Sequence, residues 1–207
     1  MSDTAAHSDA QTALVLDQTA QNILFRDART ANSFSTEPVT DEQIEAIYDL
    51  MKWAPTSANT QPLRITVVRS PDAKARLLPH MADSNRKKVE LAPAVAILSV
   101  DLDFHENIPT QFPHYPQMKD NFTELSAREP FGKFNAALQA GYFIIAVRAA
   151  GLAAGPMAGF DAAGVDTEFF GGTAHRSILV VNMGKPGDNP WFGRLPRLDF
   201  AEVVTLL

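Results

Sequence analysis

The chain has 207 residues, 45% hydrophobic residues and a formal net charge of -6 at pH 7. This is enough apolar sequence for one core and too little for two comfortable domains. The acidic balance argues against a nucleic-acid partner, and the lack of cysteine excludes disulfides, zinc-thiolate sites and thiol catalysis. No stretch resembles a membrane span or a secretory signal. We therefore expect a cytoplasmic protein with a disordered tail at residues 1–10 and a single domain at residues 11–207.

Helical signals dominate the first half of the chain. Residues 11–24 predict a first helix. Residues 40–43 match a capping box and are followed by apolar residues at helical spacing, so we expect a second helix that ends near Pro55. Two short helices are expected at 73–78 and 84–91.

Three segments rich in β-branched residues predict strands, at 65–68, 95–100 and 178–182. The middle segment is apolar at almost every position, so we expect it to be buried on both faces. The strands and helices do not alternate regularly along the chain. This order favours an α+β fold over a doubly wound sheet.

The second half of the chain combines a long irregular segment with a strongly apolar helix. Residues 103–130 contain several prolines and predict no regular structure. Residues 131–150 predict a helix that is apolar on nearly every face, and Gly151 is a suitable residue to end it. We expect a second subunit to supply part of the burial of this helix.

Most familiar cofactor motifs are missing from the sequence. There is no glycine-rich turn of the Rossmann type, no phosphate-binding loop and no nucleophile elbow. Asp101, Asp103 and His105 alternate and would face one side of an extended segment, as metal ligands do. Carboxylates after a buried strand are also ordinary loop residues, and we favour this interpretation over a metal site.

Several separated segments fit one ligand, flavin mononucleotide (FMN), which has a phosphate, a hydroxylated ribityl chain and a flat ring. Arg29, Thr30 and Asn32 offer a guanidinium, a hydroxyl and a carboxamide, although the same stretch would also make a surface turn. The loop at 55–62 carries several hydrogen-bonding side chains between two prolines. Its alternative is a long, well-capped turn.

Three further segments suit the ring and the phosphate. Asn85 and Lys88 lie on one face of a predicted helix, where a cation would stabilise an anionic reduced ring, although a lone lysine is more often solvated. The glycine-rich stretch at 151–160 would let the backbone approach the ring closely, or would simply end a helix and turn. Arg194 offers a second guanidinium for the phosphate, or is a solvated tail residue.

These residues resemble the nitroreductases, over a match that runs from about Leu24 to the C-terminus. The similarity looks closest to the malonic semialdehyde reductase branch of that family, which is linked to uracil breakdown. It rests on the segments at 28–30, 51–59, 155–161 and 194–198. The family has an arginine where Ala28 aligns and a basic residue where Asn32 stands, so Arg29 would substitute from the adjacent position.

The resemblance implies an α+β nitroreductase-like fold, with a central, mainly antiparallel sheet flanked by helices, in an intertwined homodimer that has one FMN at each end of the interface. One chain would hold FMN through its polar residues and through the backbone beside the ring. The other chain would contribute its polar loop. The residues implied for the first chain are Arg29, Thr30, Asn32, Asn85, Lys88, Pro156, Ala158, Gly159 and Arg194, and those for the second are Pro55, Thr56, Ser57 and Asn59.

The activity implied is hydride transfer from NADH or NADPH through the flavin to malonic semialdehyde, which gives 3-hydroxypropanoate with ping-pong kinetics. No general acid is required by the sequence, and His114 or Tyr115 would be available as a proton donor. Arg86, Lys87 or Lys119 would offer a cation to the substrate carboxylate. The alternatives are a broad nitroaromatic or quinone reductase and, from another class, a flavin-binding module without turnover.

Overall fold

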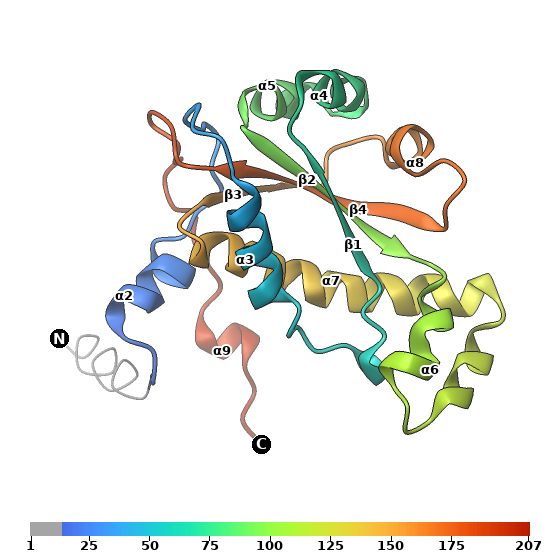
Figure 1. Cartoon of the computed structure of the whole chain (residues 1–207). Coiled ribbons are helices and arrows are strands. Elements are labelled where there is room, and N and C mark those ends of the chain that lie inside the picture. Colours follow the sequence, from blue (N-terminus) through green and yellow to red (C-terminus); the bar gives the residue numbers. More distant parts are fainter. Residues whose placement is uncertain (1–13) are drawn as a thin grey trace.

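One antiparallel sheet organises the protein (Figure 1). The structure is a computed structural model that describes residues 14–207, so the tail expected at 1–10 lies outside the described residues. The strand order is β1-β2-β4-β3. The strands are β1 (Leu63–Val68), β2 (Ala94–Asp101), β3 (Ala153–Met157) and β4 (His175–Gly184).

Helices cover both faces of this sheet (Figure 1). The α-helices are α2 (Gln18–Gln21), α3 (Asp41–Met51), α4 (Pro71–Leu77), α5 (Asp83–Leu91), α6 (Ile108–Gln111), α7 (Leu125–Ala149), α8 (Ala162–Phe170) and α9 (Phe200–Val203). Shorter helical turns are the π-type η1 (Asn22–Arg26) and the 3₁₀ turns η2 (Ser57–Asn59), η3 (Leu78–His80), η4 (Phe104–Asn107) and η5 (Pro116–Phe122).

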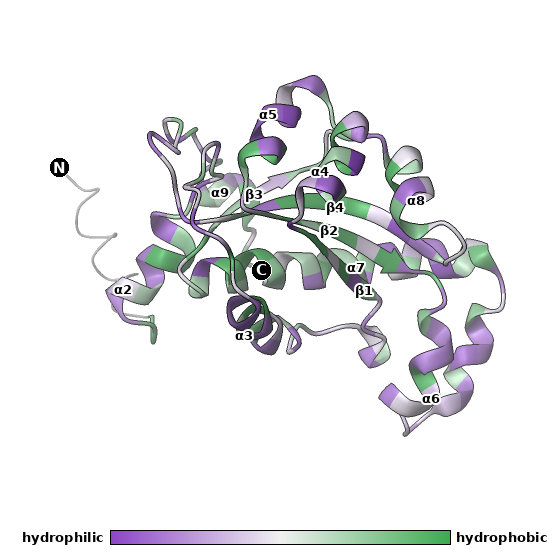
Figure 2. Ribbon diagram, turned by 45° about the horizontal axis from the view of Figure 1, so that its top comes forward, coloured by the Kyte–Doolittle hydropathy of each residue, from purple (hydrophilic) through white to green (hydrophobic). Residues whose placement is uncertain are grey.

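Alternation along β2 divides the core into two layers. Ala96 and Leu98 belong to a cluster that packs against α3 and α7, whereas Val95 and Ile97 belong to a cluster formed with α4, α5 and α8. Successive strand residues point to opposite faces, so one apolar strand serves both layers. Figure 2 shows the same arrangement, with hydrophobic central strands between the helices. The expected burial of this strand on both faces is confirmed.

The capping box predicted for the second helix is also present. The Oγ1 of Thr40 accepts a hydrogen bond from the backbone N–H of Gln43 at 3.2 Å, and the Gln43 side chain accepts one from the Thr40 N–H at 3.0 Å. The helix ends at Met51, before Pro55. The long helix likewise ends as expected, because Gly151 follows it with a φ of 72°.

The first helix is shorter and later than predicted. The sequence suggested a helix at 11–24, but Leu14 to Asp17 are not helical, and the part at 11–13 lies outside the described residues. Asp17 caps α2 by accepting a hydrogen bond from the Ala20 N–H at 2.8 Å. The capping carboxylate therefore overrides the helical pattern that precedes it.

The segment at 103–130 is not irregular, as the sequence had suggested. It contains η4, α6 and η5, and α7 begins at Leu125 with Pro130 in its second turn. The prolines at the starts of α6 and η5 are tolerated because a first-turn N–H has no helical partner, whereas Pro130 lies inside α7 and removes one N–H donor there. We call residues 104–122 the helical lobe. The lobe has a small core of its own, formed by Phe104, Ile108 and Phe122.

The glycine-rich stretch at 151–160 was expected to act as open backbone or as a turn, but its centre is strand β3. Within residues 14–207 this strand pairs with β4 alone and is therefore at an edge of the sheet, where Pro156 is tolerated without a ladder donor. The following helix, α8, was also not anticipated. Among the described residues, no helix is long and apolar enough to cross a membrane.

Candidate functional site

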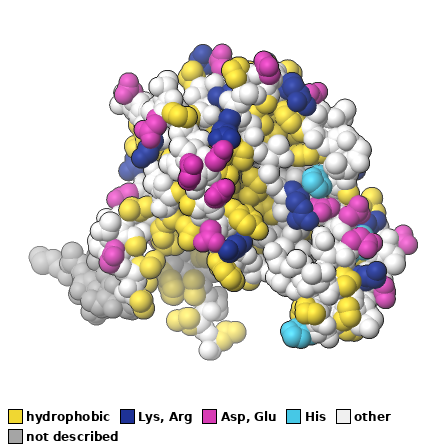
Figure 3. Space-filling view, viewed as in Figure 1, with side chains coloured by type: hydrophobic (Ala, Val, Ile, Leu, Met, Phe, Trp, Pro, Cys, Tyr) yellow, Lys and Arg dark blue, Asp and Glu magenta, His cyan; other side chains and the backbone are white. Residues whose placement is uncertain are grey.

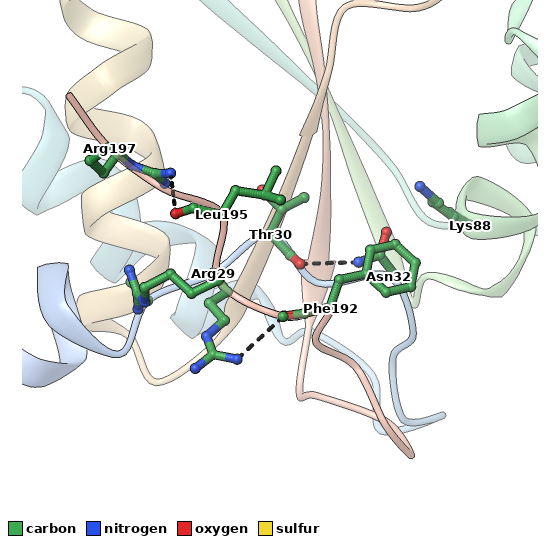
Figure 4. A pocket seen from close by; sticks show the side chains of 10 residues that line it. Arg29, Thr30, Asn32, Lys88, Phe192, Leu195 and Arg197 are labelled. Atoms are coloured by element: carbon green, nitrogen blue, oxygen red, sulfur yellow. Dashed lines mark hydrogen bonds between the residues drawn. The ribbon is translucent and has the colours of Figure 1, made fainter.

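A pocket of about 370 Å³ brings together residues from three distant parts of the chain. Its lining includes five of the predicted site residues and a stretch near the C-terminus (Figure 4). The lining residues are Ala28, Arg29, Thr30, Asn32, Lys88, Phe192, Gly193, Arg194, Leu195 and Arg197. Lys88 enters from α5, on the other side from Arg29 and Arg197.

Backbone contacts with β3 and with the C-terminal stretch place the Arg29 segment. The Ala31 N–H donates to the Ala154 carbonyl at 3.2 Å, and the Asn32 N–H donates to the Pro190 carbonyl at 2.9 Å. A Cβ at Gly155 would lie 2.9 Å from the Ala31 carbonyl oxygen. Only glycine therefore lets the segment lie this close to the strand.

The pocket is cationic and has no acidic lining residue. Arg29, Lys88, Arg194 and Arg197 form no salt bridge with any carboxylate in the part of the chain that the structure describes. The Arg29 guanidinium donates to the Phe192 carbonyl at 3.3 Å, and that of Arg194 donates to the Arg26 carbonyl. Guanidinium groups that are held by carbonyls but not neutralised suit a phosphate.

Asn85 and Gly159 meet beside this pocket. The Asn85 Nδ2 donates to the Gly159 carbonyl at 3.1 Å, and the Ala82 N–H donates to the same oxygen at 3.1 Å. Asn85 lies one helical turn before Lys88 on α5, so this bond brings the loop after β3 to the Lys88 side. Ala158 and Gly159 are exposed there, and Pro156 is half-buried.

The predicted loop residues Pro55, Thr56, Ser57 and Asn59 do not join the pocket. The Ser57 N–H donates to the Oδ1 of Asn135 at 2.7 Å, whereas the segment before Arg29 contacts α7 where Arg148 donates to the Leu24 carbonyl at 3.1 Å. Asn135 and Arg148 are separated by 13 residues of α7 (148 − 135), or about 20 Å of helix. Figure 1 shows the loop beside the lobe, at the other end of α7.

The remaining candidates lie in varied surroundings. His114 and Tyr115 are exposed on the lobe, where the His114 ring stands edge-on to Phe112. Arg86 pairs with Asp83 at 2.9 Å and Lys87 with Glu90 at 2.9 Å, so both cations are engaged. Lys119 makes no ion pair within residues 14–207.

The carboxylates considered as metal ligands are bound to arginines. Asp101 pairs with Arg64 at 2.7 Å, and Asp103 pairs with Arg128 at 2.7 Å. Asp101 also accepts a hydrogen bond from the Asp103 N–H at 2.9 Å, which forms a local turn. These partners account for both acids as structural residues at the end of β2.

The sequence interpretation missed two groups of residues around these features. Phe192 and Gly193 line the pocket, but nothing in the tail before Arg194 marks them as lining residues, and within the 194–198 segment only Arg194 had been given a role. Asn135 and Gln139 are buried in α7, and both accept hydrogen bonds from the backbone near the polar loop. Two amides four residues apart in an apolar helix were a signal that was available in the sequence.

Comparison with known proteins agrees with this fold. Residues 26–185 match the Nitroreductase family. A protein of Streptomyces griseus, named as a candidate NADH dehydrogenase/NAD(P)H nitroreductase, is 58% identical over 193 residues, which cover 93% of this chain and 98% of that protein.

Two solved structures have the same fold with low sequence identity. A candidate nitroreductase from Bacillus subtilis gives a TM-score of 0.81 at 22% identity and covers 92% of this chain and 100% of its own. A candidate nitroreductase from Exiguobacterium sibiricum, solved in complex with FMN, gives 0.81 at 20% identity and covers 93% and 98%. The expected α+β fold with an antiparallel sheet is confirmed, and the chain belongs to the nitroreductase family.

Proposed function

We propose that the protein is an FMN-dependent oxidoreductase that takes its electrons from NADH or NADPH. The observation that carries this proposal is the pocket with four cationic side chains and no acid, built partly from the predicted phosphate segment. The Exiguobacterium sibiricum structure contains FMN, and the Streptomyces griseus relative is named for NAD(P)H. Both names support the same cofactor and the same electron donor for this chain.

In this proposal, each residue of the pocket contacts a different part of FMN. Arg29 and Arg194 would bind the phosphate, Thr30 and Asn32 would bind ribityl or ring oxygens, and Lys88 would lie at the pyrimidine edge. The Asn85 to Gly159 bond holds the loop after β3, so that Ala158 and Gly159, together with Pro156 near the end of β3, would lie along the ring. Bound FMN would accept a hydride from the nicotinamide and pass it to an oxidised substrate.

The direct test is chemical. Protein purified with its ligand should release FMN, identified by mass, and the flavin absorption band should bleach rapidly on anaerobic addition of NADPH or NADH. A protein that releases FMN but does not bleach would be a flavin-binding module without turnover. A protein that neither retains nor takes up FMN would overturn the proposal.

We further propose that the enzyme is a homodimer in which each site uses the polar loop of the other chain. The loop and the pocket lie at opposite ends of α7. The loop of one chain therefore cannot reach the pocket of the same chain, and we assign it to the pocket of the other chain. The α7 face also exposes Phe134, Leu138 and Tyr142 beside an apolar cavity of about 490 Å³. Figure 3 shows a second hydrophobic area over α3 and β1, where Tyr48 is exposed.

The C-terminal segment supports the same assembly. Leu195, Leu198, Phe200 and Leu206 are 74%, 70%, 67% and 81% exposed, and the segment extends beyond the sheet and its helices (Figure 1). So many exposed apolar residues on one arm indicate an intermolecular contact. We assign that contact to a second copy of the chain.

Sedimentation measures this assembly directly. The protein should sediment as a dimer, and a Leu198→Asp, Phe200→Asp variant should shift toward monomer as the concentration is lowered. The matched change Leu91→Asp, on the exposed end of α5, should leave the dimer intact. A flavin-loaded, well-folded monomer of the unaltered chain would contradict the dimer.

For the oxidant, we propose malonic semialdehyde, which would be reduced to 3-hydroxypropanoate. Its carboxylate needs a cation, and of the three cations considered in the sequence Lys119 alone has no ion pair in the described chain. Lys119 lies on the helical lobe, as do His114 and Tyr115, which would donate the proton to the developing alkoxide. Lys119→Ala should raise KM for this substrate and leave NAD(P)H oxidation with quinones unchanged.

A broad nitroaromatic or quinone reductase is the second candidate, because the 58% identical relative is named as a nitroreductase. Competition between substrates separates the two functions. For the narrower function, kcat/KM for malonic semialdehyde should exceed that for nitrofurans and quinones. Equal or lower values would favour the broad reductase.

A further inference from the structure

The polar loop between α3 and β1 has an unusual backbone. Ala58, Asn59 and Gln61 have positive φ angles of 51°, 50° and 43°. Asparagine adopts this left-handed conformation readily, but alanine and glutamine do so at a cost. Such a cluster persists only where surrounding contacts impose it, and it is typical of functional sites.

Two buried side-chain amides of α7 hold the two ends of this loop in place by hydrogen bonds. Asn135 is fully buried, accepts a hydrogen bond from the Ser57 N–H at 2.7 Å and donates to the Phe131 carbonyl at 2.9 Å. Gln139 accepts one from the Leu63 N–H at 2.9 Å. These bonds fix where the loop begins and ends, but they do not reach Asn59.

The middle of the loop is held instead by the helical lobe. The Nδ2 of Asn59 donates to the Gln111 carbonyl at 2.8 Å. The Nε2 of Gln61 donates to the Oδ1 of Asn59 at 2.8 Å and to the Oε1 of Gln111 at 3.2 Å. Gln61 therefore uses one amide group to bridge the loop and the lobe.

This bridge fixes the orientation of the Asn59 amide. One N–H and one lone pair of the amide oxygen are engaged in these bonds. The second N–H and the second lone pair are left for another partner. Rotation of the amide by half a turn would put like groups against both Gln61 and the Gln111 carbonyl. The geometry therefore selects one of the two orientations.

We propose that Gln61 is a positioning residue that, through Gln111, ties the helical lobe to the loop and presents Asn59 to the flavin of the partner subunit. This inference rests on the proposed function, in which Asn59 contacts FMN and the lobe carries the substrate-binding side chains. If the bridge is broken, we expect both the lobe and the loop to become less ordered. Neither Gln61 nor Gln111 touches the cofactor in this account.

The decisive variant is Gln61→Glu, which keeps the size of the side chain but replaces the donor by a carboxylate. The carboxylate would repel the Oδ1 of Asn59, which the Gln111 carbonyl holds in place, and the Gln111 side-chain amide would have to rearrange. We expect kcat to fall by about tenfold, the effect of losing one net hydrogen bond, while the ratio of bound FMN to protein stays unchanged because the cationic pocket is intact. The visible circular dichroism of the bound flavin should change as well.

Rescue separates positioning from a general structural effect. Gln111→Lys in the Gln61→Glu background supplies a donor to the new carboxylate and should restore kcat to within about threefold of the unaltered protein. Gln117→Glu, the same change at an exposed position of the lobe, is the control and should have no effect. A Gln61→Glu enzyme with normal kcat and normal dichroism, or a double variant no better than the single one, would overturn the proposal.

Hydrogen exchange tests the link without any flavin. In the apoprotein, Gln61→Glu should speed amide exchange in residues 108–111 and leave exchange in β2 unchanged, and the double variant should reverse the effect. If the protein binds no FMN, the proposed function fails but this measurement still decides whether Gln61 couples lobe and loop. Unchanged exchange in 108–111 would show that it does not.

Discussion

The two regions that we assign to the cofactor are built in opposite ways. The cationic pocket is assembled from segments distant in sequence, and its guanidinium groups donate to backbone carbonyls and have no neutralising carboxylate among residues 14–207. The polar loop is local in sequence, strained in its backbone and fixed by amides from α7 and the lobe. The pocket therefore offers positive charge that no carboxylate of the described chain neutralises, whereas the loop has a conformation that is already fixed.

The two regions should therefore contribute differently, the pocket to the affinity for the cofactor and the loop to the geometry of the site. A site with unneutralised cations gains its stabilisation when an anion arrives, so changes there should appear mainly in cofactor binding. A strained and preorganised loop contributes by holding a shape, so changes there should appear mainly in stability and turnover. Substitutions in the two regions should therefore change different measured quantities.

The largest effect is expected at Arg29. Arg29→Ala removes a charge-assisted bond of about 1.5–3 kcal/mol, so FMN should bind roughly 10- to 100-fold more weakly. The affinity for riboflavin, which lacks the phosphate, should be unchanged. Fluorescence titration of the apoprotein measures both constants. Arg76→Ala, at a surface arginine paired with Glu168, is the control, and an equal loss for both ligands would argue against a phosphate contact.

The next effect is expected in the loop. Asn135→Leu leaves the Ser57 N–H without its buried acceptor, which should lower the free energy of unfolding by about 1–3 kcal/mol. Urea unfolding followed by fluorescence gives this value. FMN affinity should change much less than in the Arg29 variant. If Asn135→Leu weakened FMN binding as strongly as Arg29→Ala, the division between the two regions would not hold.

A smaller effect is expected at the start of the helix that leads into the loop. Thr40→Ala removes the capping hydroxyl of α3 and should cost about 1 kcal/mol of stability. Thr30→Ala, a lost hydroxyl in the pocket segment, serves as the comparison and should affect FMN binding more than unfolding. Thermal unfolding of the two apoproteins distinguishes them. If the Thr40→Ala protein were as stable as the unaltered one, the capping hydroxyl would not stabilise α3.

The smallest effect depends on pH. Backbone N–H and Thr40 hydroxyl donors at the start of α3 lower the pKa of Glu42 from its ordinary 4.5. A lowered carboxyl pKa adds stability that is present above pH 4.5 and is lost as the pH falls through the folded-state value. Glu42→Gln should therefore lower Tm slightly at pH 7, with a difference that disappears in acid. A difference that grew on acidification would contradict this sign.

The sequence predicted most of the fold where a local pattern decides the structure. The capping box at Thr40, the doubly buried strand β2 and the glycine that ends α7 are each determined by neighbouring residues. The failures lie where a distant contact decides. Edge strand β3 exists because β4 pairs with a stretch that resembles a turn, and η4, α6 and η5 form around their own small core.

The same distinction applies to the site. Arg29, Thr30, Asn32, Lys88 and Arg194 were proposed from their chemistry, and the structure brings them to one pocket. Phe192 lines the same pocket through the path of the C-terminal stretch, which no local pattern specifies. The bridge through Gln61 and Gln111 joins residues 50 positions apart in the sequence, so it becomes visible only in the folded chain.

If the cationic pocket holds the phosphate of a flavin, two ligands that differ in that phosphate should bind with different affinities. Apoprotein should be titrated with FMN and with riboflavin, which differ only in that phosphate. Because two guanidinium groups would each add a charge-assisted bond, FMN should bind about 100-fold or more tightly than riboflavin at low salt. Equal affinities for the two ligands, or no binding of either, would contradict the account.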